Sequence, residues 1–390
     1  MTPRFPLATS TWDQEEYDAL QRVIGSGMFS MSTEVRAFEE QFAAFFGSRH
    51  AVMVNSGSSA NLLMTAALFF TQNDGLRLRQ GDEIIVPAVS WSTTYYPLAQ
   101  YGLIQKFVDI DRETLNYDLD ALEAAIDDKT RAIMVVNLLG NPNDFNRIKA
   151  MIAGWNIVLL EDNCESMGAT FDGQQAGTFG KMGSYSSFFS HHISTMEGGV
   201  VVTDDEELYH VMLSLRAHGW TRNLPKHNHV TGTKSDDPFE ESFNFVLPGY
   251  NLRPLEMSGA LGQSQLRKLP AIIAGRRANA RLFVDRLSNH PLFTLQREIG
   301  DSSWFGFSVL LRPDARIDRA GLVARLDEAG FECRPIVAGN FTKNPVMQHI
   351  AHRIHGDLVN ARYIDENGLF IGNHHYPIPE AAEVLAGMRA

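Results

Sequence analysis

The chain has 390 residues, of which 44% are hydrophobic and 21% charged, and its formal net charge is −12. This length is too great for one simple core, so it predicts a large domain plus a smaller one. The acidic balance, without any basic block, argues against a nucleic-acid surface, and no run approaches the roughly 18 apolar residues of a membrane helix. Because the N-terminus lacks an apolar signal core, we expect a cytoplasmic protein.

Short β-rich runs alternate with helical stretches along the first part of the chain. Apolar spacing predicts helices at 13–24, 33–46 and 60–70. We expect strands at 50–54, 83–86, 105–108, 132–136, 157–161, 184–189 and 199–203. Such alternation is typical of an α/β fold with a largely parallel, buried sheet.

The pattern changes after about residue 255. The stretch 255–282 is mostly helical, and we expect a break or kink at Pro270, because a proline inside a helix removes a backbone hydrogen bond. A strand at 305–311, a helix at 319–329 and a strand at 331–336 follow. We therefore place a large domain at residues 1–270 and a smaller C-terminal α+β domain at residues 271–390.

Two predicted strand ends carry candidate binding residues. After the strand 50–54, Gly57 allows a tight turn, and small hydroxyl residues that include Ser58 open a helix. Free N–H groups and the helix dipole can hold a phosphate there, although serine caps without a ligand are also common. Asp162 lies at the carboxyl end of a predicted central strand, at the edge where open α/β sheets bind ligands. A buried carboxylate needs a partner there, which can be a pyridinium nitrogen, a structural arginine or a helix cap.

Two further segments carry polar side chains. His191 and His192 lie in a hydroxyl-rich stretch that ends in Gly-Gly, but their spacing is not that of metal ligands, and we predict no metal site. Asn251 and Arg253, in the sequence Pro-Gly-Tyr-Asn-Leu-Arg-Pro, can bind an anion or form a turn and helix cap. The chain has two cysteines, too few for four cysteine ligands to an iron–sulfur cluster.

In this order and spacing, the four segments resemble the DegT-type family of sugar aminotransferases and dehydratases, which use pyridoxal 5′-phosphate (PLP). The resemblance covers nearly the whole chain, from Trp12-Asp-Gln-Glu-Glu to Gly249-Tyr-Asn-Leu-Arg. It implies the aspartate-aminotransferase fold (PLP fold type I) and a homodimer with active sites at the subunit interface.

The resemblance also implies roles for individual residues. Gly57, Ser58 and Ser186 would hold the cofactor phosphate, Trp91 would stack on the pyridine ring, and Asp162 would pair with the ring nitrogen. Asn251 would reach the phosphate from the partner subunit, Glu165 would stand at the cofactor where aminotransferases commonly carry glutamine, and Arg253 and Arg222 would bind substrate anions.

The main departure from the aminotransferases is at His191, where they carry a lysine six residues before the Glu of Glu-Gly-Gly. No lysine lies between Lys181 and Lys226, so PLP or pyridoxamine 5′-phosphate is expected to bind non-covalently. A histidine pKa near ~6.5 suits proton exchange near neutral pH. We therefore expect His191 to move the protons of the reaction.

The histidine at position 191 and Glu165 resemble the sugar 3-dehydratases. Two kinds of these enzymes compete as the interpretation of this chain. One kind needs an iron–sulfur cluster and a partner reductase, and two cysteines argue against it. The other is cluster-free, converts glutamate to 2-oxoglutarate, and removes the 3-hydroxyl of a nucleotide-linked keto-sugar, GDP-4-keto-6-deoxy-D-mannose. This is the chemistry of 3,6-dideoxysugar biosynthesis for O-antigen and lipopolysaccharide.

Two alternatives stay open. An aminotransferase variant would make an amino sugar, which the missing lysine disfavours. A non-catalytic binding protein on the same fold is disfavoured by the joint presence of Asp162, Ser186 and Asn251.

Overall fold

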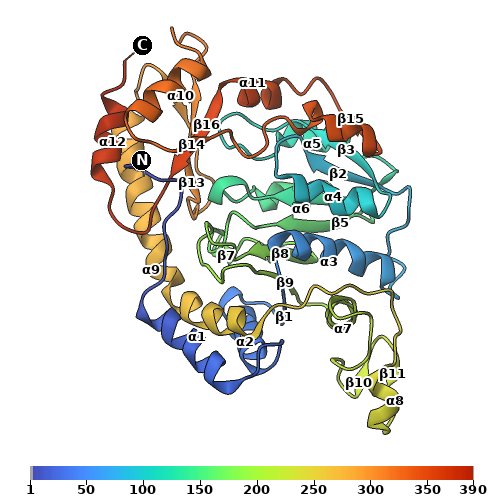
Figure 1. Ribbon diagram of the computed structural model, residues 1–390. Helices are drawn as coiled ribbons and strands as arrows, with labels where there is room; N and C mark the ends of the chain where they lie inside the picture. Colours follow the sequence, from blue (N-terminus) through green and yellow to red (C-terminus); the bar gives the residue numbers. More distant parts are fainter. Residues whose placement is uncertain (1–2, 390) are drawn as a thin grey trace.

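An eight-stranded sheet lies at the centre of the computed structural model, which describes residues 3–389 (Figure 1). The strand order is β1-β9-β8-β5-β4-β2-β3-β15. The bounds are β1 His50–Val54, β2 Glu83–Pro87, β3 Ile104–Val108, β4 Thr130–Val136, β5 Val158–Asp162, β8 Met182–Ser186, β9 Gly199–Thr203 and β15 His352–Ile354. β9 is antiparallel to β1 and β8, and every neighbouring pair from β8 to β15 is parallel. The predicted α/β fold with a mostly parallel sheet is confirmed.

Helices cover both faces of this sheet, because successive residues of a strand point to opposite sides. Val52 and Val54 of β1 belong to the core with α3 and α7, whereas Ala51 and Met53 belong to the core with α2 and α9. Farther along, α5 and α6 pack on the second face against residues such as Ile85. The helices of this unit are α1 Gln14–Ser26, α2 Thr33–Phe46, α3 Gly57–Phe70, α4 Ser92–Gln100, α5 Leu119–Ala125, α6 Phe145–Ile152, α7 Glu206–Arg216 and α9 Glu256–Leu287.

A four-stranded antiparallel sheet, in the order β12-β13-β16-β14, forms the second unit. α10, α12 and the C-terminal half of α9 pack on it through side chains such as Phe283, Leu326 and Leu385. An arm with β10, β11 and α8 projects from the large unit at the lower right of Figure 1. The remaining elements are β6 Thr170–Phe171, β7 Gln174–Gln175, β10 His227–Asn228, β11 Gly232–Thr233, β12 Phe293–Leu295, β13 Gly306–Leu311, β14 Cys333–Arg334, β16 Gly368–Gly372, α8 Pro238–Ser242, α10 Arg319–Glu328, α11 Val359–Asn367, α12 Pro379–Ala386, and the short 3₁₀ turns η1 Leu138–Gly140, η2 Phe341–Lys343 and η3 Pro345–His349.

α9 belongs to both units. Leu269 and Ile273 pack in the core with α2, whereas Ala280 and Phe283 pack against the small sheet. We expected a break or kink at Pro270; the helix continues unbroken through it, and Figure 1 shows a bend in its path. The domain boundary after residue 270 stays a prediction.

The other predicted elements are confirmed to within a few residues, and three boundaries differ for local reasons. α3 begins at Gly57, three residues earlier than predicted, because the preceding serine caps it. The strand predicted at 184–189 ends at Ser186, so its last residues lie in a loop. The strand predicted at 331–336 is reduced to Cys333–Arg334, since the next residue, Pro335, has no backbone N–H to donate to a neighbouring strand.

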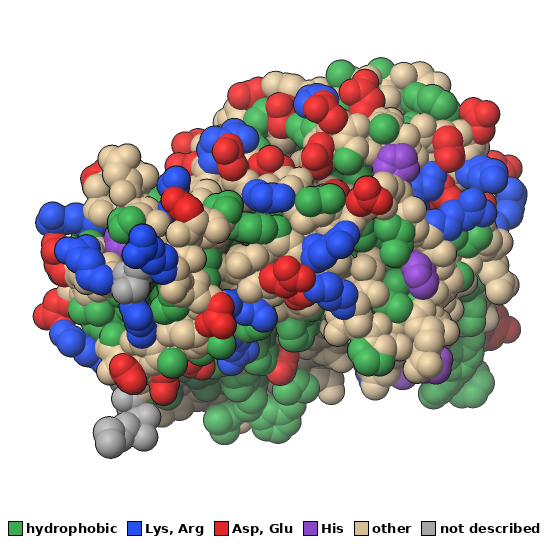
Figure 2. Space-filling model, turned by 90° about the horizontal axis from the view of Figure 1, so that it is seen from above, with side chains coloured by type: hydrophobic (Ala, Val, Ile, Leu, Met, Phe, Trp, Pro, Cys, Tyr) green, Lys and Arg blue, Asp and Glu red, His purple; other side chains and the backbone are tan. Residues whose placement is uncertain are grey.

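The surface carries both signs of charge. Acidic and basic side chains are interspersed over the face seen in Figure 2.

Within residues 3–389, no helix combines the length and apolar character needed to cross a membrane. The same residues include no group of three or more His, Cys, Asp or Glu side chains placed to hold a metal ion.

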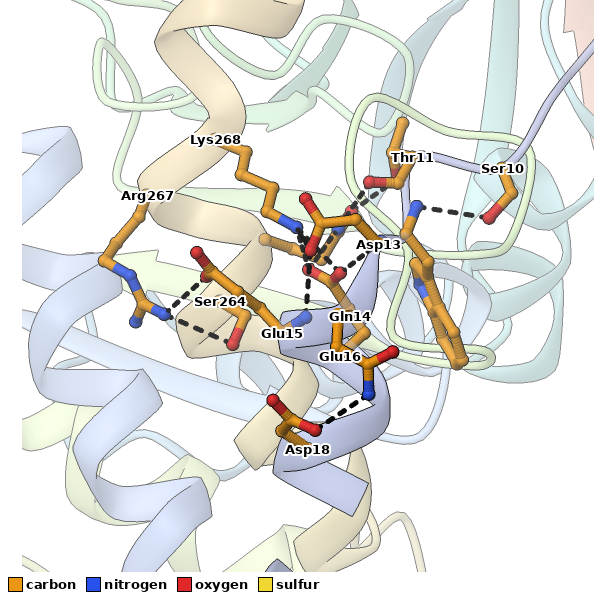
Figure 3. A network of polar contacts seen from close by, with 12 residues as sticks. Ser10, Thr11, Asp13, Gln14, Glu15, Glu16, Asp18, Ser264, Arg267 and Lys268 are labelled. Carbon is orange, nitrogen blue, oxygen red and sulfur yellow. Dashed lines mark hydrogen bonds and ion pairs between the residues drawn. The ribbon is translucent and has the colours of Figure 1, made fainter. Parts of the chain in front are cut away.

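α1 is tied to α9 by a buried carboxylate (Figure 3). Glu16 of α1 is fully buried and accepts hydrogen bonds from Lys268 at 2.7 Å and Gln265 at 2.8 Å, both on α9. It also completes a capping box with Asp13 at the start of α1. The side-chain amide oxygen of Gln265 accepts a hydrogen bond from the backbone N–H of Ser194 at 3.0 Å. The network therefore connects the N-terminal helix to the loop that follows β8.

A second buried carboxylate caps α2 from outside. Glu256, at the start of α9, accepts the backbone N–H groups of Ser32, Glu34 and Val35 at distances between 2.6 and 3.3 Å. The side chain of Ser32, the N-cap of α2, makes no capping bond of its own. Because these N–H groups have no partner inside the helix, Glu256 stabilises the start of α2 and docks it on α9.

Replacing Glu256 by glutamine is expected to lower the free energy of unfolding by about 2–3 kcal/mol, because the amide offers one acceptor oxygen and charge-assisted bonds are the stronger ones. Urea unfolding followed by circular dichroism, at fixed protein concentration, measures this change. Glu40→Gln, at an exposed position of α2, is the matched control and should stay within about 0.5 kcal/mol of the original. Equal stability of the two variants would contradict the capping role.

Candidate functional site

A cavity of about 590 Å³ opens where β5 and β8 end and α3 begins. Parallel strands bring their carboxyl ends to one edge of the sheet, and this edge faces the small unit. The cavity lining includes these residues predicted from the sequence: Gly57, Ser58, Trp91, Asp162, Glu165, Ser186 and His191. The fold therefore brings together segments that lie far apart along the chain.

The start of α3 offers donors for an anion. The N–H groups of Gly57 and Ser58 occupy the first helical positions, where no intrahelical acceptor exists. Ser186, at the end of β8, faces them closely: a Cβ built on Gly57 would lie 2.7 Å from the Cβ of Ser186. Only glycine fits at this position, and Gly57, Ser58 and Ser186 all line the cavity.

Asp162 is held from two helices. Its carboxylate accepts hydrogen bonds from Asn61 of α3 at 2.8 Å and from Thr94 of α4 at 2.7 Å. The backbone N–H of Cys164 donates to the other oxygen at 3.2 Å. Every one of these donors is uncharged, so the carboxylate keeps its negative charge directed at the cavity.

Glu165 and Trp91 lie at the same cavity. The Glu165 carboxylate accepts the backbone N–H of Leu139 at 3.0 Å. Burial, with a smaller contribution from the charge of Asp162, raises the pKa of Glu165 to about 7. Near neutral pH its carboxyl is therefore partly protonated and can resemble the glutamine of the aminotransferases. Trp91, the residue before α4, is 57% exposed, so much of its ring is open to a ligand or a partner.

His191 lies in the loop between β8 and β9. The loop folds back on itself: Ser187 N donates to Gly198 O at 2.9 Å, and Phe189 N donates to Met196 O at 3.1 Å. These bonds continue the pairing of the two strands and fix the loop from within.

The His191 imidazole is packed rather than hydrogen-bonded. Its Nδ1 is buried and has no partner within residues 3–389. The rings of Phe188 and Phe305 lie against it, with centroids 6.0 and 5.1 Å from its own. Burial and then the charge of Arg276 lower the pKa of His191 to about 4. The imidazole is therefore uncharged at neutral pH and able to accept a proton.

His192 has a different environment. It is fully buried, and its Nε2 donates to the carbonyl oxygen of Ser303 at 3.2 Å. This bond ties the loop to the segment before β13 and supports a structural role.

Three predicted residues lie outside the cavity. Asn251 is exposed, and its side-chain oxygen accepts a hydrogen bond from Arg253 at 3.0 Å. Arg222 and Arg253 both lie over the ring of Trp220, 4.1 and 5.8 Å from its centroid. A single chain does not bring these residues to the cavity, so their roles in phosphate and substrate binding stay predictions.

The sequence did not single out several supporting residues. Asn61 had a signal, because it follows Gly57 by four positions and so lies one helical turn away on the same face. Phe305, Glu332 and Arg334 line the cavity from the small unit. No local pattern assigns them to a site formed mostly by the other unit.

Comparisons with known proteins agree with this geometry. The model of the DegT/DnrJ/EryC1/StrS aminotransferase family matches residues 10–387. A GDP-4-keto-6-deoxy-D-mannose 3-dehydratase of Yersinia pseudotuberculosis is 61% identical over 382 residues, which are 98% of this chain and 97% of that protein. Two crystal structures of GDP-4-keto-6-deoxymannose-3-dehydratase are 60% identical, with TM-scores of 0.97 over 98% of this chain and 99% of theirs.

The ligands of those two structures are known. One contains a trapped PLP-glutamate geminal diamine, and the other, a variant with a histidine replaced by asparagine, contains GDP-perosamine. Aminotransferase structures that are 22–24% identical, with TM-scores of 0.84–0.86, share the fold alone. The predicted aspartate-aminotransferase fold is thereby confirmed.

Replacing Glu165 by glutamine should change how stability depends on pH. Because the folded-state pKa of Glu165 is raised from 4.5 to about 7, its contribution to stability is full below pH 4.5 and is lost as the pH rises through 7. The glutamine variant has no such pH-dependent loss. Its free energy of unfolding, relative to that of the original protein, should therefore rise by on the order of 2 kcal/mol between pH 4.5 and 8.

Urea unfolding of the cofactor-free protein at both pH values measures this difference. Glu328→Gln, at an exposed position of α10, is the control and should show no such gain. A stability difference for Glu165→Gln that does not change with pH would contradict the raised pKa.

Proposed function

Because the chain belongs to the DegT/DnrJ/EryC1/StrS aminotransferase family, we propose that it removes the 3-hydroxyl of GDP-4-keto-6-deoxy-D-mannose, with PLP as cofactor and glutamate as amine donor. One observation carries the proposal: the cavity places His191, and no lysine, among its lining residues within the described chain. The 61% identity to a dehydratase of this substrate, over nearly both whole chains, supports it.

The donor set of the cavity fits PLP. The N–H groups at the start of α3 and the Ser186 hydroxyl suit its phosphate, and the buried Asp162 carboxylate suits a protonated ring nitrogen. Trp91 offers an exposed ring for stacking. PLP, when bound, supplies an electron sink for bonds broken next to the amine. Since the cavity lining supplies no amine, the cofactor is held without a covalent bond to the chain.

His191 acts as the proton carrier. Its uncharged imidazole accepts a proton at neutral pH, and it returns the proton when the 3-hydroxyl leaves. The apolar rings of Phe188 and Phe305 pack against this imidazole and shield part of it from water. A lysine at the same place would also exchange protons, but its amine would bind the cofactor covalently and favour completed transamination.

The overall reaction balances without a further reductant. Glutamate becomes 2-oxoglutarate and loses two electrons together with its amine. The sugar gains these electrons when its C3–O bond breaks, and the amine leaves as ammonia. The chain therefore needs no iron–sulfur cluster, and its cysteines, Cys164 and Cys333, take no part in our scheme.

The proposal includes a homodimer. Asn251, Arg253 and Arg222 lie outside the cavity of their own chain, and a partner subunit that placed this surface against the cavity would bring them to it. Large apolar side chains are exposed both at the cavity and on the arm: Trp91, Phe188, Phe189, Phe239, Phe243 and Phe245. A second copy would cover such side chains. The proposal also includes a cytoplasmic location.

The first test uses purified protein with PLP, glutamate and GDP-4-keto-6-deoxy-D-mannose. We expect ammonia release and a keto-sugar product lighter by one oxygen, measured by a coupled ammonia assay and mass spectrometry. An amino sugar without ammonia would instead identify an aminotransferase. Absence of turnover and of any cofactor conversion by glutamate would identify a binding protein.

His191→Gln should lower the rate of ammonia release by about 10²–10⁴-fold, the usual contribution of a positioned acid–base group. Cofactor affinity, measured by tryptophan fluorescence quenching, should change little, because His191 supplies no phosphate ligand. His349→Gln, at an exposed position in the turn η3, is the control. Full activity of His191→Gln would remove His191 from the mechanism.

A further inference from the structure

Arg276 is a buried cation whose partners are neutral. It lies on α9 and is 5% exposed. Its Nη1 donates to the backbone carbonyl oxygens of Phe305 at 2.7 Å and Asn373 at 2.6 Å. The amide of Asn373 donates in turn to the carbonyls of Arg276 and Trp304, both at 3.0 Å. A buried charge without a carboxylate partner is costly, so this arrangement requires a reason.

Phe305 connects this cation to the cavity. Its ring packs on His191, with centroids 5.1 Å apart, and on His192, with centroids 5.7 Å apart. The Nδ1 of His191 has no partner within residues 3–389, so no acidic side chain orients the imidazole in the way that catalytic histidines are usually oriented. The His191 imidazole is therefore held by ring packing, and this packing depends on the position of the Phe305 ring.

We propose that Arg276 is a positioning residue for His191, acting through Phe305, whose carbonyl oxygen it binds and whose ring packs on the imidazole. This inference rests on the proposed function, in which His191 carries the proton.

The charge of Arg276 has a second consequence for the same imidazole. Arg276 and His192 are the neighbouring titratable groups on the side of α9 and the loop, and the carboxyls of Asp162, Glu165 and Glu197 line the same cavity. After burial, Arg276 is the cause that lowers the pKa of His191. A nearby positive charge disfavours the imidazolium, so it keeps His191 ready to accept a proton.

The experiment compares Arg276→Met, Arg276→Lys and Phe305→Leu in the full-length enzyme with PLP. Arg277→Met is the matched control, because Arg277 is the next residue of α9 and also donates to two backbone carbonyls, those of Ser302 and Asp301. Ammonia release gives kcat and KM across pH. Histidine NMR of the cofactor-free protein, with the His191 signal assigned from His191→Gln, follows the imidazole directly.

We expect Arg276→Met and Phe305→Leu to lower kcat about tenfold or more while KM for the sugar changes less than about threefold. In Arg276→Met the acid limb of kcat and the His191 titration should both move to higher pH by about one unit. Arg276→Lys keeps the charge, so it should leave both pH midpoints in place and recover part of kcat. Arg277→Met should behave as the original enzyme.

The proposal is overturned by unchanged kcat in Phe305→Leu or Arg276→Met, by an equal loss in Arg277→Met, or by a His191 titration that does not move in Arg276→Met. If Arg276→Met does not fold, the other two variants still decide. If the original enzyme releases no ammonia, the proposed function fails, whereas the NMR titration still tests the link between Arg276 and His191.

Discussion

The site depends on one buried carboxylate at the end of a parallel strand. Asp162 is buried there with hydrogen bonds from Asn61 of α3, Thr94 of α4 and the backbone N–H of Cys164. The bonds from Asn61 and Thr94 fix the N-terminal parts of both helices against β5. Fixing α3 places the N–H groups of Gly57 beside Ser186, and fixing α4 places Trp91 at the cavity. The proposed phosphate, stacking and ring-nitrogen groups are therefore brought to one cavity by a single geometric constraint.

His191 is held on a different principle. It lies in a loop, packs between aromatic rings and has no orienting carboxylate. A carboxylate partner would raise its pKa and favour the imidazolium, whereas an apolar pocket beside Arg276 favours the neutral base. The cavity thus combines a fixed negative charge at Asp162 with a neutral proton acceptor at His191. The two groups can lie at one cavity because hydrogen-bond donors surround the Asp162 carboxylate, whereas aromatic rings pack against the His191 imidazole.

The loop that carries His191 is also held from outside the cavity. Ser194 donates its N–H to Gln265 of α9 and accepts the indole N–H of Trp12 through its carbonyl oxygen, both at 3.0 Å. Gln265 itself contacts the buried Glu16, which Lys268 neutralises. The N-terminal segment and α9 therefore support the loop that carries His191, and α9 also carries Arg276. One long helix joins both units to the site.

The sequence by itself determined the α/β alternation, the strand ends at Asp162 and Gly57, and the replacement of lysine by His191, because these signals are local in the chain. It also allowed the family to be identified from the spacing of short motifs. Only the tertiary structure decided which residues surround His191, since Phe305 comes from the segment before β13 and Arg276 from α9. It likewise decided that Asn251 lies outside its own cavity and that Glu256 caps α2. Such contacts depend on packing between segments far apart in the chain, and no local pattern of residues encodes them.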